Sequence, residues 1–166
     1  MGRGLVLGFF IVVASFVIVL SACAPSTTPV SVSPSNSAYI PFRDGRESQV
    51  LLVSSNLRYG TFNEDVTFPW TNAQAVKGDS AIIISGEIRN DYEEDYYILI
   101  TADVYNSGDK RIGIILSPGA PAPGFSSIFI KRASTAPFEI WVKYEQQDVT
   151  RYQLFIPYPP STFPFP

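Results

Sequence analysis

Two stretches, 81-AIIISGEIRN-90 and 96-YYILITADVYN-106, decide how this chain folds. In the first, Ile82, Ile84 and Ile88 fall on one face, opposite a face that begins with Ile83 and continues with polar residues. In the second, the even-numbered residues from 98 to 104 are apolar, whereas the odd-numbered ones from 97 to 105 form a more polar face. A period of two is that of a half-buried β-strand, not of a helix. Both stretches therefore predict strands that bury one face.

The same alternation, with many β-branched and aromatic residues, recurs along the chain after residue 46. It predicts further strands at Gln49–Ser54, Arg58–Phe62, Arg111–Leu116, Ser126–Lys131, Phe138–Glu145 and Arg151–Ile156. Between these, the short polar loop Asn106–Lys110 predicts a hairpin, and Ser117–Gly124 is too rich in Pro and Gly for a regular element. About seven short strands over residues 46–157, with no amphipathic helix, predict an all-β domain of two antiparallel sheets packed face to face.

Residues 1–22 have the organisation of an export signal. Arg3 supplies a positive charge near the start, Leu5–Leu20 is almost wholly apolar, and small residues end the segment. These three parts form a secretory signal peptide, which is removed from the mature protein. An uncleaved transmembrane helix is the alternative, because the apolar run is near the shortest length that spans a bilayer.

The residues Leu20-Ser21-Ala22-Cys23 resemble the lipobox of bacterial lipoproteins. In that family an aliphatic residue and two small ones precede the cysteine that is lipidated, and Cys23 is the only cysteine of this chain. The resemblance implies cleavage after Ala22, a diacylglycerol thioether on Cys23 and acylation of the new amino terminus. Two or more acyl chains form a stable membrane anchor. An ordinary thiol next to the membrane is the other interpretation of Cys23.

Segments of unusual composition flank the predicted domain. Ser, Thr and Pro dominate residues 23–45, and such a composition buries too little apolar surface to offset backbone ordering, so we expect a disordered, extended linker. Residues 158–166 (YPPSTFPFP) form a proline- and aromatic-rich tail, which cannot continue a strand. The tail is expected either to pack across the end of the sandwich or to be a disordered peptide that a partner binds.

The region from Ala81 to Glu145 resembles the FxLYD type of immunoglobulin-like domain. Gly86 and Asn90 match its Gly-x-Val-x-Asn motif, and Tyr105 matches the tyrosine in the strand end that names the family. Conservative changes and the expected Pro-Gly loop are found at Ile88, Val104, Asn106 and Pro123-Gly124-Phe125. Ala102 replaces the first aromatic residue of the motif, so another side chain must fill that core position. The resemblance implies an immunoglobulin-like β-sandwich, common in exported bacterial lipoproteins, without catalytic residues.

Composition and charge exclude several classes of function. The chain has 12 basic and 15 acidic residues, a net charge of −3 and a pI near 4.9, which argues against nucleic-acid binding. Because it has no histidine, it forms no histidine-based catalytic triad or zinc site. Neither a Gly-x-Ser-x-Gly motif nor a Gly-rich phosphate loop is present. We therefore expect a protein that is not an enzyme and that needs no cofactor.

An acidic loop between the two decisive stretches is the strongest candidate for a metal site. Asp91, Glu93, Glu94 and Asp95 place four carboxylates close together in the sequence. Calcium takes six to eight oxygen ligands, and extracellular modules often bind it weakly. The spacing is not that of an EF-hand, however, and adjacent carboxylates also form solvated turns. Calcium binding and a solubilising loop are therefore both open interpretations.

Aromatic residues on the more polar strand faces are the candidate binding surface. Tyr97 and Tyr105 lie on that face of one strand, and Trp141 lies on the corresponding face of another. Exposed aromatics stack on sugars or anchor a protein partner, although in two-sheet domains they also pack under loops. Asp103, between the two tyrosines, is expected to be an exposed strand carboxylate.

These features together predict a lipoprotein anchored through Cys23 to the cell membrane, on its extracytoplasmic side. The β-sandwich is expected to bind an envelope protein, or to have a structural role there, through an exposed strand edge or an aromatic face. A carbohydrate- or calcium-binding module is the alternative.

Overall fold

The computed structural model describes residues 39–67, 74–115, 126–145 and 147–165, and the regular elements in these ranges are all β-strands. The strands are β1 (Val50–Thr61), β2 (Val66–Thr67), β3 (Gln74–Ala75), β4 (Ser80–Asn90), β5 (Tyr96–Tyr105), β6 (Arg111–Ile112), β7 (Ile114–Ile115), β8 (Ser126–Ile130), β9 (Thr135–Lys143) and β10 (Arg151–Phe155). Every pairing between named strands is antiparallel. The predicted all-β class is confirmed.

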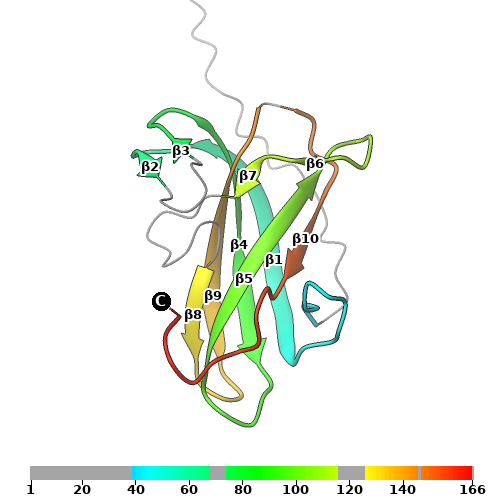
Figure 1. Ribbon diagram of the computed structural model, residues 1–166, viewed down its shortest axis with the longest axis vertical. Helices are drawn as coiled ribbons and strands as arrows, with labels where there is room; N and C mark the ends of the chain where they lie inside the picture. Colours follow the sequence, from blue (N-terminus) through cyan, green and yellow to red (C-terminus); the bar gives the residue numbers. More distant parts are fainter. Residues whose placement is uncertain (1–38, 68–73, 116–125, 146, 166) are drawn as a thin grey trace, which may run out of the picture.

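Two sheets pack face to face, which confirms the predicted antiparallel β-sandwich (Figure 1). The first sheet has the strand order β1-β4-β9-β7. The second is built around β5, which pairs with β10 through residues 101–105, with β8 through residues 96–100 and with β6 through residues 104–105. A separate ribbon consists of β2 and β3.

The core between the sheets is filled from the predicted apolar faces. Ile82, Ile84 and Ile88 of β4, and the even-numbered residues of β5 from 98 to 104, are at most 1% exposed. The neighbouring strand of each sheet completes the cluster, with Phe138, Ile140 and Val142 from β9 and with Tyr152 and Leu154 from β10. Each fully buried aliphatic side chain stabilises the fold by about 1.5–3 kcal/mol, so this cluster is the main source of stability.

The predicted strand Arg111–Leu116 is divided at Gly113. Its first part, β6, forms the predicted hairpin with β5. Gly113 has φ +83°, a conformation that favours glycine, and a Cβ there would lie 2.6 Å from the carbonyl oxygen of Lys143. The chain turns at this point and leaves the second sheet, so that β7 pairs with β9 of the first. Leu116 and the loop Ser117–Gly124 lie outside the described residues.

The two predicted strands Gln49–Ser54 and Arg58–Phe62 form one continuous strand, β1. The register of β1 against β4 shifts between Leu52 and Ser54, which marks a β-bulge. A bulge bends a strand without ending it, and β1 continues through residues 55–57, between the two predicted strands. Gly86 of β4 lies opposite this part of β1, as the partner of Ser55.

Residues 39–45, called here the N-terminal strap, contact the sandwich, although the sequence predicted a disordered linker up to residue 45. The Ile40 N–H donates to the Val50 carbonyl in β1 (2.9 Å), and the Arg43 N–H donates to the Ile156 carbonyl after β10 (3.1 Å). The strap thereby joins the edges of both sheets, and Ile40 is fully buried. The sandwich consequently starts before the predicted boundary at residue 46.

The tail also contacts the sandwich. Tyr97 of β5 and Ser161 exchange two backbone hydrogen bonds, of 2.7 and 3.0 Å. The tail therefore runs across the front of β5 towards β8, as Figure 1 shows. Of the two predicted alternatives, this course agrees with a tail that packs on the sandwich. The side chain of Phe163 nevertheless stays 76% exposed.

A second, smaller hydrophobic cluster lies on the outer face of the first sheet. Its buried members, each at most 1% exposed, are Phe62, Ala75, Ala81 and Ile83. Val66 and Trp141 pack against this cluster. The β2–β3 ribbon supplies Val66 and Ala75 and covers this end of the sheet. The outer face of β4 is therefore buried at Ala81 and Ile83 and carries polar residues beyond Ile83, as the alternation predicted.

Candidate functional site

The predicted anchor lies outside the described residues. These begin at residue 39, so Leu20, Ser21, Ala22 and Cys23 and most of the linker are not among them. Export and lipidation therefore stay predictions. The four described ranges contain no helix with the length and apolar character that crossing a membrane requires.

The three aromatic residues of the predicted binding surface lie on two different faces. Tyr97 and Tyr105 stand at the two ends of β5, on the outer face of the second sheet. Trp141 lies on the outer face of the first sheet, where its ring is 5.3 Å from that of Phe62 and its indole N–H donates to Glu139 Oε1 (2.7 Å). Trp141 thus belongs to the second hydrophobic cluster, and the three residues do not form one surface.

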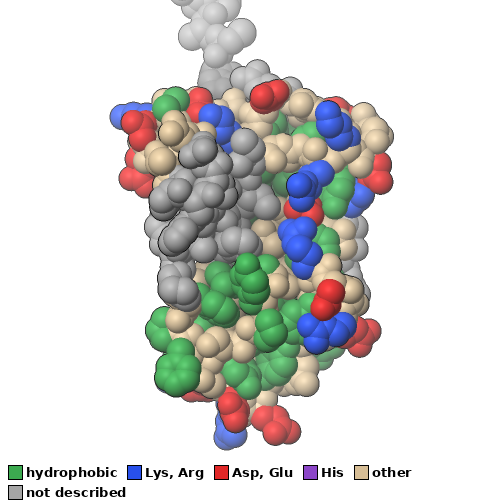
Figure 2. Space-filling view, in the orientation of Figure 1, with side chains coloured by type: hydrophobic (Ala, Val, Ile, Leu, Met, Phe, Trp, Pro, Cys, Tyr) green, Lys and Arg blue, Asp and Glu red, His purple; other side chains and the backbone are tan. Residues whose placement is uncertain are grey.

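An exposed aromatic patch, defined here as Tyr97, Phe129 and Phe163, occupies one end of the outer face of the second sheet. The rings of Tyr97 and Phe129 are 4.9 Å apart, because the two residues are register partners on β5 and β8. Phe163 follows shortly after Ser161, which pairs with Tyr97. Phe129 is 48% exposed and Phe163 76%. Figure 2 shows hydrophobic side chains gathered over this part of the face.

Asp103 lies on the same outer face and is buried, contrary to the expectation of an exposed carboxylate. Arg43 of the strap donates to both of its oxygens, from Nη1 to Oδ2 at 3.0 Å and from Nη2 to Oδ1 at 3.3 Å. Arg111 Nη1 lies 3.6 Å from Oδ1. Two guanidinium groups therefore compensate the charge of one buried carboxylate, which otherwise would be strongly destabilising.

Tyr105 is flanked by two arginines on this face. Its register partners are Arg151 on β10 and Arg111 on β6, and directly opposed residues share a face. The Arg151 guanidinium lies 3.6 Å from the centre of the Tyr105 ring, and its Nε donates to Asp109 Oδ1 (3.0 Å). The hydrogen bond with Asp109 raises the pKa of Arg151 above its usual value, so this side chain is a permanent cation.

The acidic loop does not bring its carboxylates together. Arg89 Nε and the Tyr39 hydroxyl donate to the two oxygens of Asp91, at 2.6 and 3.1 Å, and the hydrogen bond from Arg89 lowers the pKa of Asp91. Asp95 Oδ1 instead accepts the backbone N–H of Arg132 (2.8 Å). In the described part of the chain, which includes the whole loop, no three Asp, Glu, Cys or His side chains form a group that holds a metal ion. The geometry favours a solvated loop.

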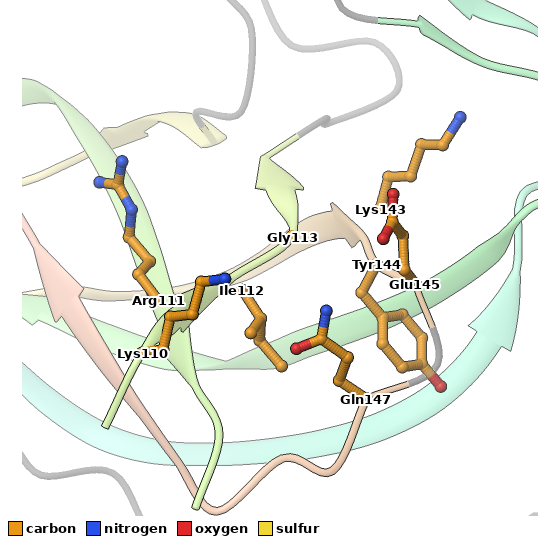
Figure 3. A pocket seen from close by; sticks show the side chains of 8 residues that line it. All are labelled: Lys110, Arg111, Ile112, Gly113, Lys143, Tyr144, Glu145 and Gln147. Carbon is orange, nitrogen blue, oxygen red and sulfur yellow. The ribbon is translucent and has the colours of Figure 1, made fainter. Parts of the chain in front are cut away.

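A cavity of about 200 Å³ lies between the β6–β7 turn and the end of β9 (Figure 3). It is lined by Lys110, Arg111, Ile112, Gly113, Lys143, Tyr144, Glu145 and Gln147. Lys143 already binds Asp79 Oδ2 (2.7 Å) and the Gln74 carbonyl (2.9 Å), and Figure 3 shows Arg111 and Lys143 extending away from the cavity. Because its polar groups do not converge, the cavity is not a candidate site.

The candidate site is therefore the outer face of the second sheet, with the aromatic patch at one end of β5 and arginines around Tyr105 at the other. Sequence reasoning found Tyr97 and Tyr105 but missed Phe129, Phe163 and Arg43, since strand register and chain ends bring these together. Comparison with known proteins adds no identity, because no family model, curated protein or solved structure matches this chain.

Proposed function

We propose that this protein is a lipid-anchored, extracytoplasmic binding module that contacts an envelope protein through the outer face of the second sheet. The aromatic patch is the observation that carries this proposal. Contiguous exposed apolar side chains mark interaction sites, and aromatic residues and arginine are enriched in the centres of protein interfaces. A flat sheet face with both kinds of residue suits a protein surface better than it suits a small molecule, which needs a concave site.

The predicted tether agrees with such a role. From Cys23 to Tyr39 the chain has about 16 residues, which reach about 50 Å when extended at roughly 3.1 Å per residue. This length lets the sandwich move away from the bilayer and turn its outer face towards a partner while it stays attached.

Replacement of the predicted lipidation site tests the anchor. The wild-type protein is expected to begin at Cys23 and to carry the mass of its acyl chains, whereas Cys23→Ser is expected to lack that mass, because the thioether needs the cysteine sulfur. Ser26→Ala, a neighbouring change in the linker, should leave the protein in the membrane. Fractionation and mass spectrometry of the amino terminus are the measurements. A membrane-bound wild-type protein that still begins at Met1 would instead establish an uncleaved helix.

A photo-crosslinking side chain at position 129 tests the binding face. We expect it to yield a discrete adduct with one envelope protein, whereas the same side chain at Val76, 53% exposed near the β2–β3 ribbon, should yield none. Once the partner is recovered, Phe129→Ser should weaken its binding roughly tenfold or more, as expected for a central aromatic contact. Equal adducts at both positions, or no adduct at position 129, would contradict the proposal.

A further inference from the structure

Positive charge is concentrated on the outer face of the second sheet. Four arginines, called here the arginine row, lie along it: Arg43, Arg46, Arg111 and Arg151. They contact three carboxylates, those of Asp44, Asp103 and Asp109. The row thus has one positive charge more than the carboxylates that it contacts, although the protein as a whole carries a net charge of −3. Figure 2 shows the basic side chains as a column along the β6 and β10 side of the face.

The geometry leaves this charge directed towards solvent. The carboxylate of Asp103 lies beneath Arg43 and Arg111, with 6% of its side chain exposed, whereas these two side chains are 43% and 63% exposed. Arg111 and Arg151 stand on either side of Tyr105, two strand spacings apart, which is about 10 Å. At this point the face presents two guanidinium groups above one buried anion, whereas Arg46 and Arg151 each pair with an exposed carboxylate, of Asp44 and Asp109.

Aromatic rings hold three of these guanidinium groups in place. Arg151 lies over the Tyr105 ring at 3.6 Å, Arg43 over the Phe155 ring at 4.8 Å, and Arg46 over the Phe42 ring at 5.1 Å. A stacked guanidinium loses less side-chain freedom when it binds a carboxylate. The three guanidinium groups are therefore held in place before any ligand arrives, although each also donates to a carboxylate of this chain, for which a ligand would compete.

We propose that the arginine row binds an extended acidic segment of a protein, whose apolar part packs on the aromatic patch. This inference rests on the proposed function and names the chemistry of the partner. In an extended chain, alternate side chains project to one side about 6.5–7 Å apart, so one segment can present several carboxylates to the row. Tyr97 and Tyr105 are eight residues apart on β5, about 26 Å, which matches the width of a standard interface of about 800 Å² per partner.

The combination of residues favours a protein over an anionic membrane. Membrane surfaces attract flexible clusters of lysine and arginine, worth about 1 kcal/mol for each charge. Here the cations are arginines fixed on aromatic rings, and arginine and aromatic residues are those that dominate protein hot spots.

Fluorescence anisotropy of labelled poly-L-glutamate, titrated with the full-length mature protein in detergent at low and physiological salt, tests the inference. We expect saturable binding that the double variant Arg111→Gln/Arg151→Gln weakens at least tenfold. The matched control Lys131→Gln/Arg132→Gln removes two charges from the β8–β9 turn and should change binding less than twofold. Arg111→Lys/Arg151→Lys keeps the charge but loses stacking and bidentate geometry, so an intermediate loss is expected.

Three results would overturn the inference: no binding by the wild-type protein, equal losses in the row and control variants, or tighter binding to phosphatidylglycerol vesicles than to poly-L-glutamate. The far-ultraviolet circular dichroism of each variant checks that it is folded. A discrete crosslink at position 129 without poly-L-glutamate binding would remove the acidic partner and keep the proposed function. The reverse result would remove the proposed function and leave an anion-binding face.

Discussion

Gly86→Ala is expected to destabilise the protein by roughly 3 kcal/mol or more, among the largest effects of any single substitution in the fold. A Cβ on Gly86 would lie 2.0 Å from the Ser54 carbonyl oxygen and 2.8 Å from the Ser55 Cα. These are backbone atoms of the bulged strand β1, so they cannot rotate away as a side chain does. Strands β1 and β4 would have to separate, with loss of the hydrogen bonds between them. Urea unfolding of both proteins measures the effect.

Gly60→Ala is the matched control, because Gly60 also lies in β1 and pairs with β4. Its Cβ would meet Ile83 Cδ1 at 2.9 Å, the end of a flexible side chain that can adopt another rotamer. We expect a cost of about 1 kcal/mol or less. Similar losses in the two variants would show that the close approach of β1 to Gly86 does not limit stability.

Ile40→Ala is expected to cost about 2–5 kcal/mol, the range for an isoleucine removed from a packed core. Ile40 is fully buried and belongs to the main hydrophobic cluster, although it comes from the strap. Its loss would leave a cavity between the sheets and weaken the contacts that hold the strap to β1. The unfolding midpoint in urea, together with its slope, measures the change.

Val53→Ala is the control for this prediction. Val53 lies in β1 near the bulge, is 48% exposed, and should change the free energy of unfolding by about 0.5 kcal/mol or less. If Ile40→Ala proves equally mild, the strap does not contribute to the core and the folded domain begins near residue 46, as the composition alone suggested.

The strands and their inner faces were predictable because β-alternation is a local property. The isoleucines of β4 and the even-numbered residues of β5 were assigned to the core from their spacing alone, and they are buried. The errors came where a strand departs from regular geometry. The sequence predicted two strands where β1 is one continuous, bulged strand, and the positive φ of Gly113 divided a strand that the alternation predicted as continuous.

The candidate site was only partly predictable because its members come from distant segments. Tyr97 was identified, but Phe129 joins it through strand register, and the pairing of Ser161 with Tyr97 brings the part of the tail with Phe163 to the same end of β5. Asp103 was expected to be exposed, since no local signal shows that Arg43 reaches it from the predicted linker. Trp141 satisfied the same local pattern as Tyr97, yet the β2–β3 ribbon and Phe62 make its face part of a small core.

By itself, the sequence determined that the domain is built of strands and which side of most strands is apolar, and it predicts an export signal that ends in a lipidated cysteine. These properties depend on neighbouring residues, whose spacing is set by the covalent chain. Only the tertiary structure decided that the strap closes the sandwich, that Asp103 is buried under two arginines, and that an aromatic patch and an arginine row share one face. Those features depend on which strands pair and in which register, and that choice is made by the packing of the whole core.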